Sequence, residues 1–141
     1  MKIFSAATTI AASPEAIWAI LTNAAGYPEW DPGVERIEGR IGPGERITAY
    51  TKLTPGRAFP ATVTNFVPAR SMTWTGGLPL GLFKGERTFT LSPHADGGTE
   101  FTLREVFSGP LLGLFGRSLP NLTPVFEQFA AGLKRHAERG A

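Results

Sequence analysis

The sequence predicts an α+β domain in which a curved antiparallel sheet of about seven strands wraps around a long C-terminal helix, with a cavity between them. Three observations support this fold. Short segments of alternating apolar and polar residues follow one another, separated by turn signals such as Gly42-Pro43-Gly44. The long amphipathic helical pattern comes last in the chain. An arginine and a glutamate fall on the apolar side of one predicted hairpin.

Length and composition set the first limits on function. The chain has 141 residues and is 42% hydrophobic, which is enough to bury one core, so we expect a single domain over residues 1–141. The net charge of +2 is mild and the basic residues are scattered, which argues against a nucleic-acid partner. Cysteine is absent, histidine occurs twice and no nucleotide-binding fingerprint is present, so we expect neither a metal site nor a cofactor. With no signal-peptide core and no bilayer-spanning apolar run, the expected location is the cytoplasm.

The chain begins with a predicted strand over residues 3–12 and then a helix. Ser13-Pro14-Glu15 marks the start of this helix, because serine can cap it, proline suits its first position and glutamate suits its positive end. The segment Tyr27-Pro28-Glu29-Trp30-Asp31-Pro32 is too rich in proline for a long element and predicts a tight turn or a short helix.

A series of strands follows, each bounded by glycine and proline turns. Their apolar positions alternate with polar ones, which indicates an antiparallel meander with one face buried. The predicted strands contain residues 37–41, 47–53, 59–63, 72–76, 85–91 and 101–107.

The last two strands form the hairpin with the inward charges. Side chains alternate across a strand, so Arg87 shares a face with Phe89, and Glu105 shares a face with Leu103. Folding the hairpin about residues 94–98 opposes Arg87 with Glu105 and Phe89 with Leu103. A charge pair that faces an apolar interior is unfavourable unless it is paired or wetted. A partly hollow interior would accommodate it, and this indicates a ligand cavity.

The chain ends in a predicted helix with one apolar face. Pro124 is awkward inside this helix, so we expect either a kink near Pro124 or a start with Thr123 as the cap. Pro120 is another candidate for the first turn. The apolar positions are spaced four, three and four residues apart, at Leu122, Phe126, Phe129 and Leu133.

Several segments in this order resemble a known superfamily. They are Ser13-Pro14-Glu15-Ala16-Ile17-Trp18, Tyr27-Pro28-Glu29-Trp30-Asp31-Pro32, Pro68-Ala69-Arg70 before Met72-Thr73-Trp74, Phe89-Thr90-Leu91, and Glu105-Val106-Phe107-Ser108-Gly109. Over nearly its whole length the chain is similar to the SRPBCC or START-like helix-grip superfamily, and within it to the polyketide cyclase/dehydrase-like group. The resemblance implies the fold more strongly than a function. Members bind lipids, quinones, hormones or polyketides, some cyclise or dehydrate them, and others assist protein partners. The resemblance brings no universal catalytic motif.

The first functional hypothesis is binding or transport of a small, mostly hydrophobic molecule between the last helix and the sheet. Arg87 and Glu105 would then fix the polar end of the ligand, although they could equally form a structural ion pair between strands. The indole N–H groups of Trp30 and Trp74 would each require a hydrogen-bond partner. The candidate cavity walls are Trp30, Ala49, Thr51, Val63, Trp74, Phe89, Leu103, Leu122, Phe126 and Phe129.

Two alternatives come from other classes. In a cyclase or dehydratase, Glu105 would be the general base and Arg87 would stabilise a developing enolate. A separated, accessible pair would favour that chemistry, and a sealed bidentate pair would favour a structural role. In a partner-binding module, the apolar loops 77–83 and 109–116 would provide the contact surface. The same loops could instead gate the cavity or touch a membrane.

These hypotheses define the expected partners. We expect a small hydrophobic ligand, no nucleic acid and no stable membrane insertion, with the protein present as a monomer or a homodimer.

Overall fold

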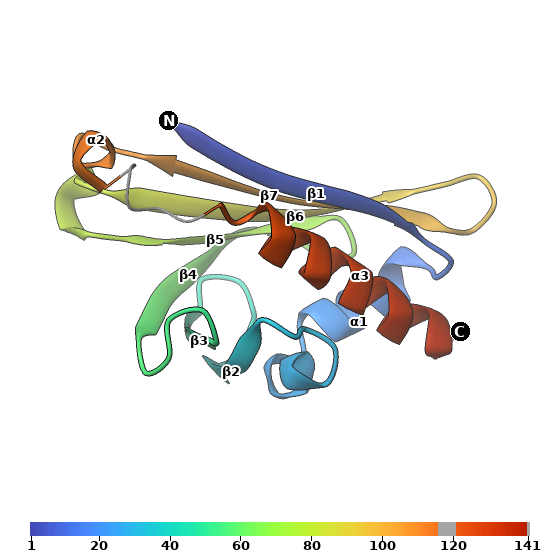
Figure 1. Cartoon of the computed structure of the whole chain (residues 1–141). Coiled ribbons are helices and arrows are strands. Elements are labelled where there is room, and N and C mark those ends of the chain that lie inside the picture. The colour runs from blue at the N-terminus through green and yellow to red at the C-terminus, as the bar shows by residue number, and fades with distance from the viewer. Residues whose placement is uncertain (116–120, 141) are drawn as a thin grey trace.

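The computed structural model describes residues 1–115 and 121–140 and has a curled antiparallel sheet facing a long C-terminal helix (Figure 1). The seven strands lie in the order β1-β7-β6-β5-β4-β3-β2, so the first strand pairs with the last one and every other neighbour is consecutive in the chain. The strands are β1 (Lys2–Ile10), β2 (Val34–Gly39), β3 (Arg46–Thr51), β4 (Ala58–Val67), β5 (Ser71–Gly77), β6 (Lys84–Pro93) and β7 (Thr99–Ser108). This confirms the predicted fold class.

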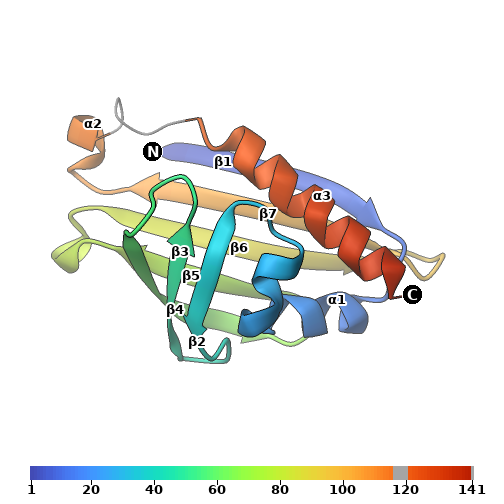
Figure 2. The ribbon, with the colours of Figure 1, turned by 60° about the horizontal axis from the view of Figure 1, so that its bottom comes forward.

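Helices cover the concave face of this sheet. The α-helices are α1 (Pro14–Leu21), α2 (Leu112–Phe115) and α3 (Thr123–Arg139), and the 3-10 helices are η1 (Ala24–Glu29) and η2 (Pro79–Gly81). Figure 2 shows α3 lying across β1 and β7, while α1, η1 and the β2–β3 hairpin occupy the rest of that face.

Helix α1 begins as its sequence predicts. The Ser13 hydroxyl accepts a hydrogen bond from the N–H of Ala16 at 3.1 Å, and Pro14 and Glu15 lie in the first turn. The cap satisfies one of the N–H groups that a helix start leaves free, and the glutamate lies at the positive end of the helix. Its apolar side, which includes Ile17 and Leu21, is fully buried.

Helix α3 corrects one expectation. It begins at Thr123 and runs to Arg139 as one helix. The residue before it, Leu122, has helical backbone angles, and Oδ1 of Asn121 accepts a hydrogen bond from the Thr123 N–H at 3.1 Å. Thr123 is therefore not the cap. Pro124 lies in the first turn, where the missing N–H has no partner to lose, so no kink is needed. Pro120 lies outside the described residues.

Strand β3 is shorter than its apolar alternation predicts. It ends at Thr51, two residues before the end of the predicted strand 47–53, and Leu53 is 54% exposed. The reason is the turn that follows. The Lys52 N–H donates to the carbonyl of Gly33 at 2.9 Å, and the Thr51 and Thr54 hydroxyls lie 3.2 Å apart, which draws the chain out of the sheet.

The centre of the core is a group of six touching rings, here called the aromatic cluster. Phe129 of α3 is its hub, with ring centroids 4.9 Å from Trp30, 5.8 Å from Phe89 and 6.0 Å from Phe101. Rings at such distances attract one another beyond the area they bury. The cluster joins η1, α3 and the central strands, and it consists of Tyr27, Trp30, Trp74, Phe89, Phe101 and Phe129.

One glycine of α3 permits this packing. Gly132 is buried, and a Cβ placed on it would overlap the carbonyl oxygen of Trp30. The backbone of α3 therefore lies directly on the backbone at the end of η1, which fixes where Trp30 enters the cluster.

Gly132→Ala should destabilise the protein by about 1–3 kcal/mol, the usual effect of overfilling a packed core. This loss of stability is opposite to the general rule, since alanine normally stabilises a helix interior by about 0.5–1 kcal/mol over glycine. Urea unfolding measures the difference. The matched control is Gly113→Ala in α2, because no described atom lies within 4 Å of a Cβ at Gly113. A stable Gly132→Ala variant would contradict the close approach of α3 to Trp30.

Candidate functional site

The predicted charge pair forms on the concave face. Cross-strand register places Arg87 opposite Glu105 and Phe89 opposite Leu103, as the hairpin analysis expects. Nε and Nη2 of Arg87 both lie 3.0 Å from Oε1 of Glu105, and the two side chains are 28% and 14% exposed. The guanidinium also lies over the Phe126 ring, 5.0 Å from its centroid. The pair is closed through one carboxylate oxygen and is only partly shielded from solvent, so it is neither separated nor sealed.

The two tryptophans near this pair have unmet hydrogen-bonding groups. Trp30 and Trp74 are 5% and 6% exposed, and within the described part of the chain the indole N–H of each is buried without a partner. A buried donor without an acceptor typically costs about 1–3 kcal/mol, and folded proteins contain few of them. Both indoles belong to the aromatic cluster, where their ring centroids lie 4.6 and 5.9 Å from that of Tyr27.

Two polar residues of the site were missed by the sequence analysis. The Tyr27 hydroxyl is buried and donates to the carbonyl of Leu21 at 2.6 Å. Asp31 is 8% exposed, and its Oδ1 accepts from the N–H of Gly33 at 3.0 Å. Both flank Trp30 in the proline-rich segment 27–32. That segment was the only signal, and it indicated a turn rather than a buried carboxyl.

Burial sets the protonation of these two groups. It raises the pKa of the Asp31 carboxyl, although the Gly33 N–H and the charges of Arg87 and Lys52 pull that pKa back down. Burial also raises the pKa of the Tyr27 phenol well above its ordinary value of 10.0, and again the charge of Arg87 opposes the change. Arg87 therefore acts electrostatically on three acidic groups, the side chains of Tyr27, Asp31 and Glu105.

The other predicted wall residues divide by exposure. Ala49, Thr51 and Leu122 are half-buried. Between α3 and the central strands, rings of the aromatic cluster contact one another and fill part of the space where the cavity was expected. The cavity itself therefore stays a prediction. The fully or nearly fully buried members are Trp30, Val63, Trp74, Phe89, Leu103, Phe126 and Phe129.

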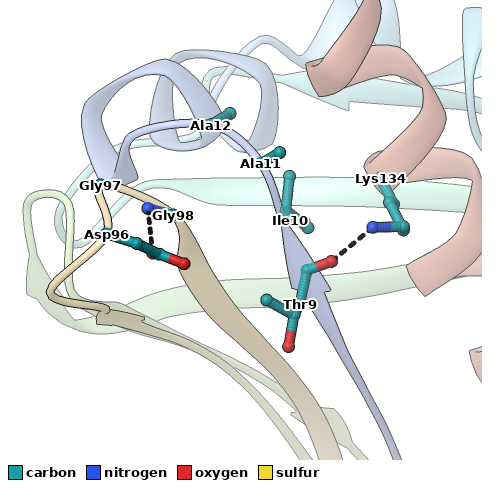
Figure 3. Close-up of a pocket in the computed structure, with 8 residues that line it drawn as sticks. All are labelled: Thr9, Ile10, Ala11, Ala12, Asp96, Gly97, Gly98 and Lys134. Atoms are coloured by element: carbon teal, nitrogen blue, oxygen red, sulfur yellow. Dashed lines mark hydrogen bonds between the residues drawn. The ribbon is translucent and has the colours of Figure 1, made fainter.

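Two surface hollows lie away from the aromatic cluster. One, of about 400 Å³, lies between the end of β1, the β6–β7 turn and α3 (Figure 3). Its polar groups already have partners: Lys134 Nζ donates to the carbonyl of Thr9 at 2.6 Å, and Asp96 Oδ1 accepts from the Gly98 N–H at 2.9 Å. This hollow therefore marks where α3 is fastened to β1. The other, of about 390 Å³, lies beside residues 75–84.

The two apolar loops meet in space. The Leu111 N–H donates to the carbonyl of Leu82 at 2.9 Å, and Gly109 lies close to the same carbonyl. This confirms that the loops are neighbours over residues 77–83 and 109–115, while residue 116 lies outside the described residues. Whether they gate a cavity stays a prediction.

Two other features are absent from residues 1–115 and 121–140. These residues include no helix long and apolar enough to cross a membrane. In the same residues, no three histidine, cysteine, aspartate or glutamate side chains come together as they would around a metal ion.

Asp31→Asn should stabilise the protein at pH 7 and lose that advantage in acid. A carboxyl whose pKa is raised by folding destabilises the folded state once it is ionised, so stability falls as pH rises above the ordinary value of 3.8. Urea unfolding at several values between pH 4 and 7 measures the effect. Asp96→Asn is the matched control, since Asp96 makes the same kind of bond to Gly98 on an exposed turn. An Asp31→Asn variant that is less stable at every pH would show that the negative charge of Asp31 is needed.

Arg87→Met should reduce the free energy of unfolding by about 2 kcal/mol. This lies between the values for exposed pairs and fully buried pairs, because the ion pair is partly solvated. Adding Glu105→Leu should recover part of the loss, because no unpaired carboxylate then remains. Arg36→Met serves as the control and should matter much less, since Arg36 and Glu38 are 52% and 54% exposed. No recovery in the double variant would show that Arg87 stabilises through Phe126 rather than Glu105.

Comparisons with known proteins agree with this architecture. The family model described as polyketide cyclase / dehydrase and lipid transport matches residues 1–138. Comparison with curated proteins gives no match. Among solved structures, the Zhui aromatase/cyclase from Streptomyces sp. R1128 is 15% identical with a TM-score of 0.75, over 98% of this chain and 94% of that one.

Two further structures have the same fold. A START superfamily protein from Mycobacterium smegmatis is 18% identical, with a TM-score of 0.71 over 99% of each chain. A protein from Mesorhizobium loti is 20% identical, with a TM-score of 0.76 over 99% of each chain. At such identities the likeness concerns the fold, and the family match extends over nearly the whole sequence. The chain therefore belongs to the polyketide cyclase/dehydrase and lipid-transport family, and it has the fold of the START superfamily protein.

Proposed function

We propose that this protein binds a small, mostly apolar molecule that bears an oxygen acceptor, on the concave face of the sheet beside α3. The observation behind the proposal is the pair of buried indole N–H groups, of Trp30 and Trp74, that have no partner in the described part of the chain. A ligand carbonyl or phenol oxygen would accept a hydrogen bond from such a donor and remove its desolvation penalty.

The surroundings of these donors favour the same kind of ligand. Aromatic rings flank both indoles and would contact a flat apolar molecule. The partly exposed pair of Arg87 and Glu105 provides a charged end to this surface, where an acidic ligand group could replace the carboxylate on Arg87. The family description combines polyketide cyclases with lipid transport, and a lipid is apolar over most of its surface while a polyketide carries oxygen acceptors.

The ion pair does not decide between binding and catalysis. A general base needs a free carboxylate oxygen that can reach the substrate proton. In Glu105, Oε1 is held by two nitrogens of Arg87, each 3.0 Å away, and the ion pair does not use Oε2. Binding is proposed first because it rests on the indole N–H groups, which need no reaction. The structural similarity to an aromatase/cyclase concerns the fold and adds no argument for a reaction here.

The test uses a pair of probes that differ in their oxygens. The wild-type protein should bind 1,8-dihydroxyanthraquinone about 5- to 30-fold more tightly than anthracene, because one or two new hydrogen bonds are worth roughly 1–2 kcal/mol in total. Binding of the quinone is measured by its visible absorption, and binding of anthracene is measured by the fluorescence of anthracene itself. Trp30→Phe and Trp74→Phe, which keep an aromatic ring and remove the N–H, should each reduce this preference severalfold.

The matched control is Trp18→Phe. Trp18 packs on Phe66, with ring centroids 5.2 Å apart, and lies outside the aromatic cluster. Its replacement should leave the preference for the quinone unchanged. Equal affinity for the two probes, or a preference that survives both cluster variants, would rule out the indole N–H groups as the recognition element.

A further inference from the structure

Tyr27 touches both of the tryptophans whose indole N–H groups have no partner in the described part of the chain. Its ring centroid lies 4.6 Å from that of Trp30 and 5.9 Å from that of Trp74. Its carbonyl also accepts a hydrogen bond from the Trp30 N–H at 3.2 Å, so backbone and side chain both connect Tyr27 to Trp30. Whatever holds Tyr27 in place therefore also holds the two indoles.

The end of α1 holds Tyr27 in place. The last carbonyls of a helix have no partner inside the helix, so a buried one needs a partner from elsewhere. The carbonyl of Leu21, the last residue of α1, accepts a hydrogen bond of 2.6 Å from the Tyr27 hydroxyl. Both residues are buried, so water cannot readily replace either group. This bond fixes the outer end of the phenol ring against which the two indoles pack.

The proton of the Tyr27 hydroxyl is already used. Burial raises the pKa of this phenol well above its ordinary value of 10.0, so the hydroxyl keeps its proton at neutral pH. A phenol has one proton to donate, and here it goes to the carbonyl of Leu21. None is left for a ligand oxygen, which leaves that donation to the indole N–H groups of Trp30 and Trp74.

We infer that Tyr27 is a positioning residue that makes the site select ligands with oxygen acceptors over hydrocarbons of the same shape. The inference rests on the proposed function and adds the residue that sets its selectivity. A hydrogen bond weakens steeply when the donor turns away from the acceptor, whereas apolar contact has no such direction. Donors are aimed within these limits by neighbours that are themselves held by packing and hydrogen bonds, as Tyr27 is.

Tyr27→Phe tests the inference, because it removes one oxygen and keeps the ring. The preference of the protein for 1,8-dihydroxyanthraquinone over anthracene should fall about threefold or more, while the affinity for anthracene stays within about twofold. The matched control is Tyr50→Phe, which removes the other of the two phenols in the chain. The Tyr50 ring lies 3.8 Å from the guanidinium of Arg36, outside the aromatic cluster, so this variant should keep the full preference.

A second measurement shows whether Tyr27 acts through the indoles. The three tryptophans give three indole N–H signals in a ¹H–¹⁵N NMR spectrum of the ligand-free protein, and Trp→Phe variants assign them. Tyr27→Phe should shift or broaden the signals of Trp30 and Trp74 more than that of Trp18, which packs on Phe66. A merely structural loss of stability would not single out these two signals.

A stabilised background keeps the test usable if Tyr27→Phe unfolds too readily. Leu80 has a φ of 61° and a side chain that is 96% exposed, so Leu80→Gly relieves a left-handed backbone without removing a packed side chain. Both measurements are then made on Leu80→Gly with and without Tyr27→Phe.

Three results would overturn the role of Tyr27 alone. The first is an unchanged preference for the quinone in Tyr27→Phe. The second is an equal loss of affinity for both probes, which would assign Tyr27 to ordinary packing. The third is a reduced preference with unmoved signals of Trp30 and Trp74, which would assign a direct contact between the Tyr27 hydroxyl and the ligand. Equal affinity of the wild type for both probes would instead overturn the proposed function, and this inference with it.

Discussion

The contact on which the rest of the structure depends is made by the ring of Phe129. It comes from α3 and touches rings from η1, β6 and β7 at once. Three residues later, Gly132 lets the same helix lie against the backbone at Trp30. The helix is therefore positioned by a ring on one turn and by the absence of a side chain on the next. Since Trp30 is placed by this contact, the candidate site depends on core packing, and changes far from a ligand would alter its affinity.

The concave face combines apolar rings with charges that share one arginine. Arg87 pairs with Glu105, lies over Phe126 and opposes the effect of burial on the pKa values of Tyr27 and Asp31. Full burial of so many ionisable groups would be strongly unfavourable. Partial exposure of the Arg87–Glu105 pair reduces that penalty, and the raised pKa of Asp31 favours its neutral form. A ligand acid at this position would compete with the carboxylates that already interact with Arg87.

Much of the fold follows from local patterns. The pairing of Arg87 with Glu105 is predictable because side chains alternate strictly and the β6–β7 turn leaves little choice of register. The start of α1 is predictable because its capping residues act within one turn. The outward position of Leu53 is not predictable from local patterns, because the strand ends where the Lys52 N–H donates to the carbonyl of Gly33, which is distant in the sequence. The predicted cap of α3 is wrong, because the side chain of Asn121, and not that of Thr123, accepts a hydrogen bond from the first N–H of the helix.

The candidate site is predictable only in part. Trp30, Trp74 and the ion pair stand out as inward polar groups on apolar faces. Tyr27 and Asp31 become buried only when α3 reaches η1, a contact with no local signature in segment 27–32. The free space between the rings also cannot be read from a pattern of residue types, because it depends on how side-chain volumes fit together.

The sheet remains open, so it has two edge strands, and unprotected edges invite pairing between molecules. At the end of β1, side chains of α3 occupy backbone groups: Lys134 binds the carbonyl of Thr9, and Glu138 accepts from the N–H of Ala11. At the other edge, β2 is short, has an irregular register between Val34 and Arg36, and exposes charged side chains. The contacts of Lys134 and Glu138 that fasten α3 to β1 therefore also hinder the edge-to-edge strand pairing that leads to aggregation.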